Sequence, residues 1–236
     1  LKESGYQTAM TGKWHLSDDP IPYGFDTNFG GLKWGAPKSY FSPYRNPKLK
    51  DGPKGEHLPA RLATDLCHWI RNAEEKSERF FVYFPFYSVH TPIQARADLT
   101  ARYNGKSGTH HSNAKYAAMI EAMDLAVGQI LDLLDELKLA GNTLVVFTSD
   151  NGPHGGVSNA RPLRGSKGMF YEGGIREPFL VRWPGKIKAS TRIATPIHQI
   201  DLLPTLAALG KAKAPEKLDG VDLSPLFQGN PIPERS

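Results

Sequence analysis

The chain has 236 residues, of which 39% are hydrophobic, 29 are Lys or Arg, 24 are Asp or Glu and one is Cys. This length is enough for one domain with a sizeable core, and no apolar run approaches the roughly 20 residues that a membrane-spanning helix needs. One cysteine excludes an intramolecular disulfide and a cysteine-based zinc site, and the net charge of +5 favours anionic ligands without requiring a nucleic-acid partner.

Both ends of the chain read like the interior of a longer sequence. The first five residues, Leu1 to Gly5, lack an initiator Met and a signal peptide, and they are typical of a last helical turn before glycine. The last eight residues have the composition of a loop. We therefore expect an interior piece of a larger protein.

Strand and helix patterns alternate along the chain, which favours an α/β fold. A short strand is expected within residues 6–16, and an irregular Gly-, Pro- and Lys-rich stretch over residues 20–59 predicts functional loops. The apolar periodicity predicts a helix over residues 61–76, and residues 80–84 predict a buried strand. The apolar face of this helix consists of Leu62, Leu66, Trp69, Ile70 and Ala73.

The most regular helical pattern covers residues 113–139, with Asn113 as its N-cap and Gly141 as its stop. Residues 143–148 and 179–183 predict further buried strands, and Asp201 is expected to cap a short helix. The apolar stripe of the long helix consists of Tyr116, Ile120, Met123, Val127, Ile130, Leu131, Leu134 and Leu137.

Polar groups follow the predicted strands, where α/β sheets place their sites. Asp150 and Asn151 offer successive carboxylate and amide oxygens that can face a hard cation, and Gly152 permits a sharp turn. Asn-Gly is also a common hairpin signal, so an ordinary turn is the competing interpretation. The polar loop that follows Pro153 is not a partner strand, which weakens that alternative.

Lys13, His15 and His90 are further candidates. In an extended chain Lys13 and His15 would project to one face, with Trp14 on the other, although a solvated edge strand is the alternative. A lone histidine such as His90, close to a proline, also serves as a capping or packing residue in many proteins.

Lys167 stands in a glycine-rich basic segment that lacks the P-loop pattern. Together with the hard-metal pair, two lysines and the histidines are what an enzyme acting on a tetrahedral oxyanion requires. The cations stabilise charge that develops on the oxygens, and a histidine can protonate the leaving alkoxide.

Several segments occur in this chain in the order found in the formylglycine-dependent (type I) sulfatases, and the chain resembles that family over nearly its whole length. The resemblance implies an alkaline-phosphatase-like α/β sheet flanked by helices, with residues 1–236 as a partial catalytic domain, incomplete at the N-terminus and lacking the C-terminal subdomain. The matching segments are residues 5–8, 12–16, 24–26, 87–92, 148–152, 167–174 and 218–226.

The resemblance also implies roles for individual residues. Asp150 and Asn151 correspond to the later two ligands of a Ca²⁺ ion, with Mg²⁺ as an alternative. Lys13 and His15 correspond to the pair that contacts the formylglycine nucleophile, with His15 assisting the release of sulfate. His90 and Lys167 correspond to residues that bind the sulfate group and help the ester oxygen to leave.

The chain departs from the family in its nucleophile motif, Cys-x-Pro-x-Arg ahead of the Lys-His segment. Cys67 has Arg71 four residues later, but Trp69 stands where Pro or Ala belongs, and Cys67 follows Lys13 on a predicted helix. We interpret Cys67 as a core thiol. No serine motif replaces it, and the two early metal-binding aspartates have no counterpart. The chain alone is therefore expected to be inactive, either as part of an active sulfatase or as a catalytically dead relative.

The expected activity is hydrolysis of sulfate esters on a small molecule or glycan, with a periplasmic or secreted location implied by the resemblance. A phosphodiester or phosphonate-ester hydrolase of the same superfamily, or a non-catalytic protein that binds a sulfated ligand, are the alternatives. Specificity is expected in residues 33–54 and 95–113, with a solvated basic surface as the competing interpretation. The candidate contacts to an anionic sugar are Lys38, Tyr40, Tyr44, Arg45, Arg96, Arg102, His110 and His111.

Overall fold

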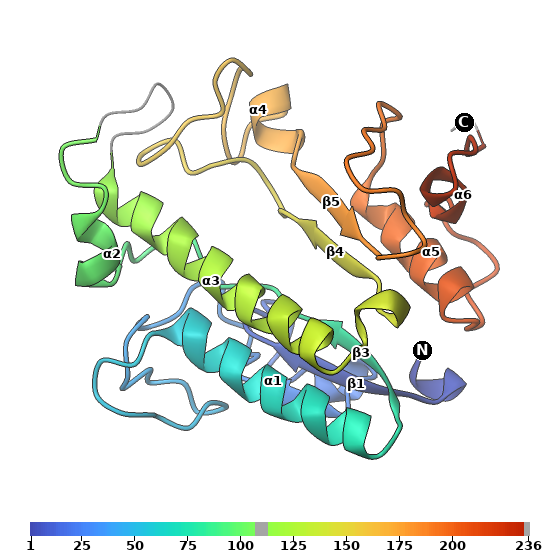
Figure 1. Ribbon diagram of the computed structural model, residues 1–236. Helices are drawn as coiled ribbons and strands as arrows, with labels where there is room; N and C mark the ends of the chain where they lie inside the picture. The colour runs from blue at the N-terminus through green and yellow to red at the C-terminus, as the bar shows by residue number, and fades with distance from the viewer. Residues whose placement is uncertain (107–112, 234–236) are drawn as a thin grey trace.

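The structure is a computed structural model that describes residues 1–106 and 113–233. Within these residues β1 (Tyr6–Thr11), β2 (Thr27–Phe29) and β3 (Arg79–Tyr83) form a parallel sheet in the order β2-β1-β3 (Figure 1). A separate pair, β4 (Val145–Thr148) and β5 (Phe179–Arg182), is antiparallel. The predicted α/β class is confirmed, and β1 is a central strand, so the edge-strand interpretation of the Lys13 segment is wrong.

Two long helices pack against each other beside the parallel sheet. The helix α1 (Leu58–Glu75) begins three residues earlier than predicted, because Pro59 is tolerated in a first helical turn. Its predicted apolar face is buried apart from Trp69, and Leu66 and Ile70 join Leu133 and Leu134 in one buried cluster. In Figure 1, α3 (Ala114–Glu136) runs between α1 and the β4–β5 pair.

The helix α3 starts where it was predicted to start, but its end and its buried face differ from the prediction. The Asn113 side chain accepts a hydrogen bond from the Tyr116 backbone N–H, as expected of an N-cap. The helix ends at Glu136 because Lys138 adopts a left-handed φ of 58°, and Gly141 is not its stop. Ile120 is exposed, and the buried face instead includes small side chains that allow close packing, namely Ala117, Ala118, Ala122 and Ala126.

The buried carboxylate of Asp201 connects the start of α5 (Leu202–Leu209) with the segment that precedes α6 (Ser224–Phe227). Asp201 takes the predicted N-cap position of α5, although without a side-chain cap hydrogen bond. Its carboxylate oxygens accept from the backbone N–H groups of His198 at 2.7 Å and Val221 at 2.9 Å. The remaining short elements are η1 (Lys2–Ser4), η2 (Ile21–Tyr23), α2 (Ala97–Ala101), η3 (Ala140–Asn142), α4 (Glu172–Ile175) and η4 (Gln199–Asp201).

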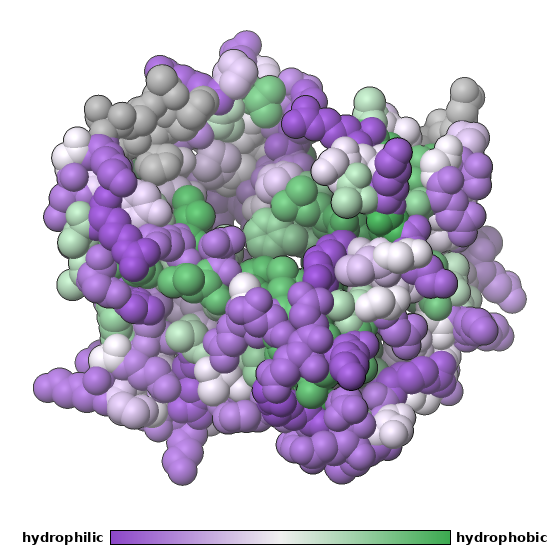
Figure 2. All heavy atoms as spheres, in the orientation of Figure 1, coloured by the Kyte–Doolittle hydropathy of each residue, from purple (hydrophilic) through white to green (hydrophobic). Residues whose placement is uncertain are grey.

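The strands β3, β4 and β5 are only partly buried, so the prediction of fully buried strands is wrong. Within the described residues, β3 pairs with β1 alone and β4 with β5 alone, which leaves each with one open edge. Figure 2 shows hydrophobic atoms gathered in the middle of one face, where Figure 1 draws α3 and β4. Among the described helices, none combines the length and the apolarity required to cross a membrane.

Candidate active site

The turn after β1 places Lys13 and His15. Because β1 ends at Thr11 and both Gly12 and His15 have positive φ values of 104° and 62°, the segment is not extended, and the argument that Lys13 and His15 share a strand face is wrong. The Lys13 backbone N–H donates to the Pro85 carbonyl at 2.7 Å, which fastens this turn to the segment after β3. A left-handed φ is uncommon at a non-glycine residue such as His15. Where such residues do occur, they cluster at functional sites.

The loop that follows β2 holds the His15 imidazole. The His15 backbone N–H donates to the Leu32 carbonyl at 2.8 Å. A Cβ atom at Gly35 would lie 2.7 Å from His15 Nε2, so the ring lies directly against the backbone of this loop. The lack of a side chain at residue 35 therefore makes room for the histidine.

An ion pair between Lys13 and Asp150 connects the end of β1 with the end of β4. Lys13 Nζ lies 3.7 Å from Asp150 Oδ2, with the Lys13 side chain only 16% exposed and that of Asp150 72% exposed. The Asn151 side-chain amide donates to Asp150 Oδ1. Lys13 is thus brought together with Asp150 and Asn151, from which it is distant in the sequence.

The Lys167 loop packs directly on the turn that follows β4. The Lys167 backbone N–H donates to the Pro153 carbonyl at 3.0 Å, and the Gly152 N–H donates to the Gly174 carbonyl at the same distance. A Cβ atom at Gly152 would lie 2.1 Å from the Gly173 carbonyl oxygen, so only glycine permits this contact. The partner of β4 is β5, which begins only at Phe179, so Asn151 and Gly152 do not form the turn of a tight hairpin.

His90 belongs to a loop whose backbone carbonyl groups contact the Tyr40 hydroxyl. The Tyr40 hydroxyl lies 2.6 Å from the Tyr87 carbonyl oxygen and 3.0 Å from that of His90, and can donate to them. His90 Nδ1 lies 3.0 Å from the Thr91 carbonyl oxygen. Within residues 1–106 and 113–233, no hydrogen bond or ion pair connects His90 with Lys13 or Asp150, and a packing role for His90 stays open.

Asp150 and Asn151 carry oxygen ligands of the type that a hard cation prefers, but two side chains do not complete a coordination shell. Ca²⁺ takes six to eight oxygen ligands. In the part of the chain that the structure describes, no group of three or more His, Cys, Asp or Glu residues could hold a metal ion. The two side chains therefore fit part of a coordination shell.

Glu177 is an acidic neighbour of Asp150 that the sequence patterns did not reveal. Burial raises the pKa of the Glu177 carboxyl group, and the Asp150 charge raises it further. Thr148 pairs with Phe179, and continuing this antiparallel register by two residues places Glu177 opposite Asp150. Only the pairing of β4 with β5 could have identified it.

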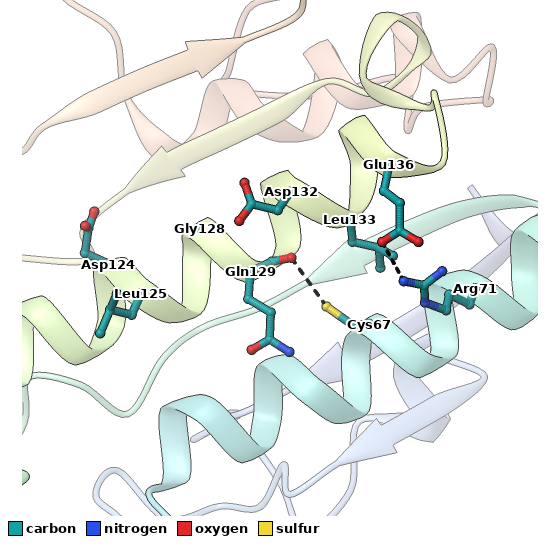
Figure 3. A pocket seen from close by; sticks show the side chains of 9 residues that line it. All are labelled: Cys67, Arg71, Asp124, Leu125, Gly128, Gln129, Asp132, Leu133 and Glu136. Carbon is teal, nitrogen blue, oxygen red and sulfur yellow. Dashed lines mark hydrogen bonds and ion pairs between the residues drawn. The ribbon is translucent and has the colours of Figure 1, made fainter.

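Cys67 lies in a surface groove between α1 and α3 (Figure 3). Its Sγ atom is 3.8 Å from the Gln129 carbonyl oxygen, and the neighbouring Arg71 forms an ion pair with Glu136 at 2.7 Å. Burial raises the pKa of the Cys67 thiol, which disfavours the nucleophilic thiolate. The cysteine is buried, as predicted for a core thiol.

The predicted specificity residues separate into four groups. Tyr40 and Tyr44 are fully buried core residues and cannot contact a sugar, so these two predictions are wrong. Arg96 forms an ion pair with Asp98, and Arg102 with Glu121. Lys38 and Arg45 are exposed and form no ion pair with the described residues, whereas His110 and His111 lie outside the described residues.

Comparisons with known proteins agree on one family. The family described as Sulfatase matches residues 1–212. The chain is 37% identical over 199 residues to a "Sulfatase" of Formosa agariphila, covering 78% of this chain and 36% of the relative. It is 32% identical over 269 aligned positions to the N-acetylgalactosamine-6-sulfatase of Canis lupus familiaris, covering 100% of this chain and 49% of the relative. The chain thus spans at most about half the length of these two curated relatives.

A solved structure is similar to nearly the whole chain. The crystal structure of Ps i-CgsB in complex with k-i-k-neocarrahexaose matches with a TM-score of 0.86 at 32% sequence identity, covering 97% of this chain and 56% of the other.

Proposed function

The chain belongs to the sulfatase family, and from this premise we propose that it forms part of a hydrolase that cleaves sulfate esters of carbohydrates. The observation that carries the proposal is the 3.7 Å approach of Lys13 Nζ to Asp150 Oδ2. This contact joins two strand ends that each carry a motif of an oxyanion-handling enzyme, and the Lys167 loop packs beside them. A carbohydrate substrate is favoured because relatives are named for a sulfated sugar or were solved with an oligosaccharide.

Membership of the family implies a metal ion. We propose Asp150 and Asn151 as two of its oxygen ligands and Ca²⁺ as the ion, with Mg²⁺ as the alternative, because both cations select oxygen donors. When bound, such an ion stabilises negative charge on the sulfate oxygens. Because the Asp150 charge adds to burial in raising the pKa of Glu177, a cation bound at Asp150 would relieve this repulsion.

The residues of this chain then have separate tasks. The Lys13 ammonium group, largely shielded from solvent, stabilises anionic oxygens near Asp150. His15, held by the Leu32 carbonyl and the backbone at Gly35, is positioned to move a proton at its imidazole as sulfate is released. His90 and Lys167 bind the sulfate group and assist the departure of the ester oxygen. We propose that a formylglycine outside these 236 residues is the nucleophile and that the parent protein is periplasmic or secreted.

Turnover by the full-length parent protein tests this proposal. We expect hydrolysis of an aryl sulfate and a much slower reaction with an aryl phosphate diester. Removing one preorganised charge-stabilising donor typically costs about 100- to 1,000-fold in kcat, and we expect a loss of this size for Lys13→Met. Lys33→Met is the matched control, because Lys33 is an exposed lysine whose ion-pair partner is the exposed Asp18 at 3.0 Å.

Other outcomes have distinct meanings. Preferential cleavage of the phosphate diester would favour the phosphodiesterase alternative. A full-length protein that binds sulfated sugars but cleaves no sulfate ester would favour the non-catalytic alternative. Equal kcat values for Lys13→Met and Lys33→Met would contradict the role of Lys13.

A further inference from the structure

Residues 34–40 connect the two candidate catalytic histidines. At one end Gly35 supports the His15 ring, because a Cβ atom there would lie 2.7 Å from Nε2. At the other end the fully buried Tyr40 places its hydroxyl 3.0 Å from the His90 carbonyl oxygen. Both ends of this short segment are therefore fixed to the candidate active site.

Lys38 lies between these two anchors, and its charge is not paired with a carboxylate in the part of the chain that the structure describes. Its Nζ atom is 4.4 Å from the centroid of the Trp34 ring. Such a cation–π contact orients an ammonium group without neutralising it. Among the described residues no Asp or Glu pairs with Lys38, whereas Lys33 in the same loop pairs with Asp18 at 3.0 Å. Lys38 is thus a cation that Trp34 orients and that has no carboxylate partner within residues 1–106 and 113–233.

The segment length limits how far Lys38 can lie from the site. A fully extended chain spans at most about 3.6 Å per residue. The Lys38 Cα atom is therefore within roughly 11 Å of that of Gly35 and within roughly 7 Å of that of Tyr40. Lys38 is therefore close enough to the His15 and His90 segments for its side chain to reach the glycan that carries the reacting sulfate.

We propose that Trp34 and Lys38 form a second anion-binding subsite, which recognises an additional sulfate or carboxylate group on the glycan that carries the scissile sulfate ester. The preferred substrate would then be a carbohydrate with at least two anionic groups. This inference rests on the proposed sulfatase function. Trp34 holds the ammonium group in place, and Lys38 supplies the charge-assisted hydrogen bond.

Steady-state kinetics of the full-length protein test the subsite with four substrates: an aryl sulfate, a monosulfated sugar, its disulfated form and a form with one sulfate and one carboxylate. For Lys38→Gln we expect KM to rise about tenfold with either doubly anionic sugar, at unchanged kcat. KM for the aryl sulfate and the monosulfated sugar should stay the same. Trp34→Leu should give a smaller rise of the same kind, and Lys33→Gln, the matched control, should change nothing.

The two doubly anionic sugars distinguish which group the subsite takes, and a rise in KM for either one supports it. An equal change with all four substrates, or no change for Lys38→Gln, would overturn the subsite. If the wild type cleaves no sulfate ester, the proposed function fails, and titration calorimetry with the disulfated sugar then decides the subsite alone. A roughly tenfold weaker Kd for Lys38→Gln but not for Lys33→Gln would support it, and equal affinities would reject it.

Discussion

The chemical role of an individual side chain in this protein depends on its surroundings more than on its residue type. Lys13 and Lys33 are both lysines that form an ion pair with an aspartate. The Lys13 side chain is largely shielded from solvent beside Asp150, whereas the Lys33 side chain is exposed beside Asp18. Cys67 resembles the start of a nucleophile motif when only the spacing to Arg71 is considered. Its position on α1, with a raised thiol pKa, gives it the properties of a packing residue.

The position of Cys67 predicts that it is dispensable for catalysis. Cys67→Ala in the full-length protein should leave kcat for an aryl sulfate unchanged, because the Sγ atom lies in the groove between α1 and α3 beside the Gln129 carbonyl. Mass spectrometry of the peptide that contains residue 67 should show an unmodified cysteine and no conversion to formylglycine. Loss of all turnover in a folded Cys67→Ala protein, or an aldehyde at residue 67, would identify this cysteine as the nucleophile after all.

His57 predicts a dependence of stability on pH. Burial against Tyr40 and Phe41 lowers its pKa from 6.5 to about 4, with a smaller lowering by Arg96, while the Gln94 carbonyl and Asp98 act in the opposite direction. Because the unfolded chain binds a proton below pH 6.5 and the folded chain does not, this contribution to the free energy of unfolding is complete above pH 6.5. It is lost as the pH falls toward about 4, by on the order of 3 kcal/mol in total.

Urea unfolding of the full-length protein at pH 7, 6 and 5 measures this effect. His57→Gln should reduce the slope of unfolding free energy against pH by up to about 1.4 kcal/mol per pH unit, whatever its effect on stability at pH 7. Parallel pH curves for the wild type and the variant would show that His57 is not responsible.

Secondary-structure elements divide clearly into those that the sequence patterns could predict and those that they could not. The amphipathic helix α1 and the Asn113 cap of α3 depend on local periodicity and on one side-chain hydrogen bond, and both were predictable. The three-residue strand β2 and the antiparallel β4–β5 pair depend on contacts between distant segments, which no local pattern contains.

The same distinction applies to the candidate site. The motif segments around Lys13, Asp150 and Lys167 could be recognised from residue type and order, but their mutual placement follows from tertiary contacts. The extended-strand argument for His15 was wrong because the chain turns at Gly12, where the carbonyl of Pro85 approaches from the segment after β3. Burial of Tyr40 and Tyr44 was likewise hidden, since loop residues are ordinarily exposed.

The close approach at Gly12 predicts how a mutation there affects the packing of β1 against the β3 segment. A Cβ atom at Gly12 would lie 2.2 Å from the Pro85 carbonyl oxygen, in addition to the cost of a φ of 104°. Gly24 is a matched control, because its φ of 98° is similar but no atom lies within 4 Å of a Cβ there. Gly24→Ala should cost about 1 kcal/mol of unfolding free energy, and Gly12→Ala should cost several times as much.

Thermal and urea unfolding of the two glycine variants compare these costs directly in the full-length protein. Gly12→Ala should also lower kcat, because the turn that carries Lys13 must shift away from Pro85. Equal losses of stability for the two alanine variants would mean that the contact with Pro85 is not tight in solution.

On the scale of the whole molecule, the family match and the structural likeness to a solved protein agree with the alkaline-phosphatase-like sulfatase fold predicted from motif order. The 236 residues nevertheless leave apolar side chains and open strand edges at the surface. Phe170 is 95% exposed beside Lys167, and Leu180 on β5 is 61% exposed. Exposed apolar patches and unpaired strand edges are the surfaces through which proteins associate.

These surfaces predict that the 236-residue chain self-associates when it is produced alone. We expect it to elute above the size of a monomer in size-exclusion chromatography with light scattering, and to bind a hydrophobic dye more strongly than the full-length parent protein does.

A Phe170→Lys, Leu180→Lys double variant should shift the chain toward the monomer, because both side chains are exposed and a charge on each opposes association. The double exchange Lys54→Glu, Lys186→Glu at exposed positions is the control and should not have this effect. A monomeric, dye-negative wild-type chain would show instead that β3 and β4 tolerate their open edges, and would strengthen the case for a self-sufficient protein that binds sulfated ligands.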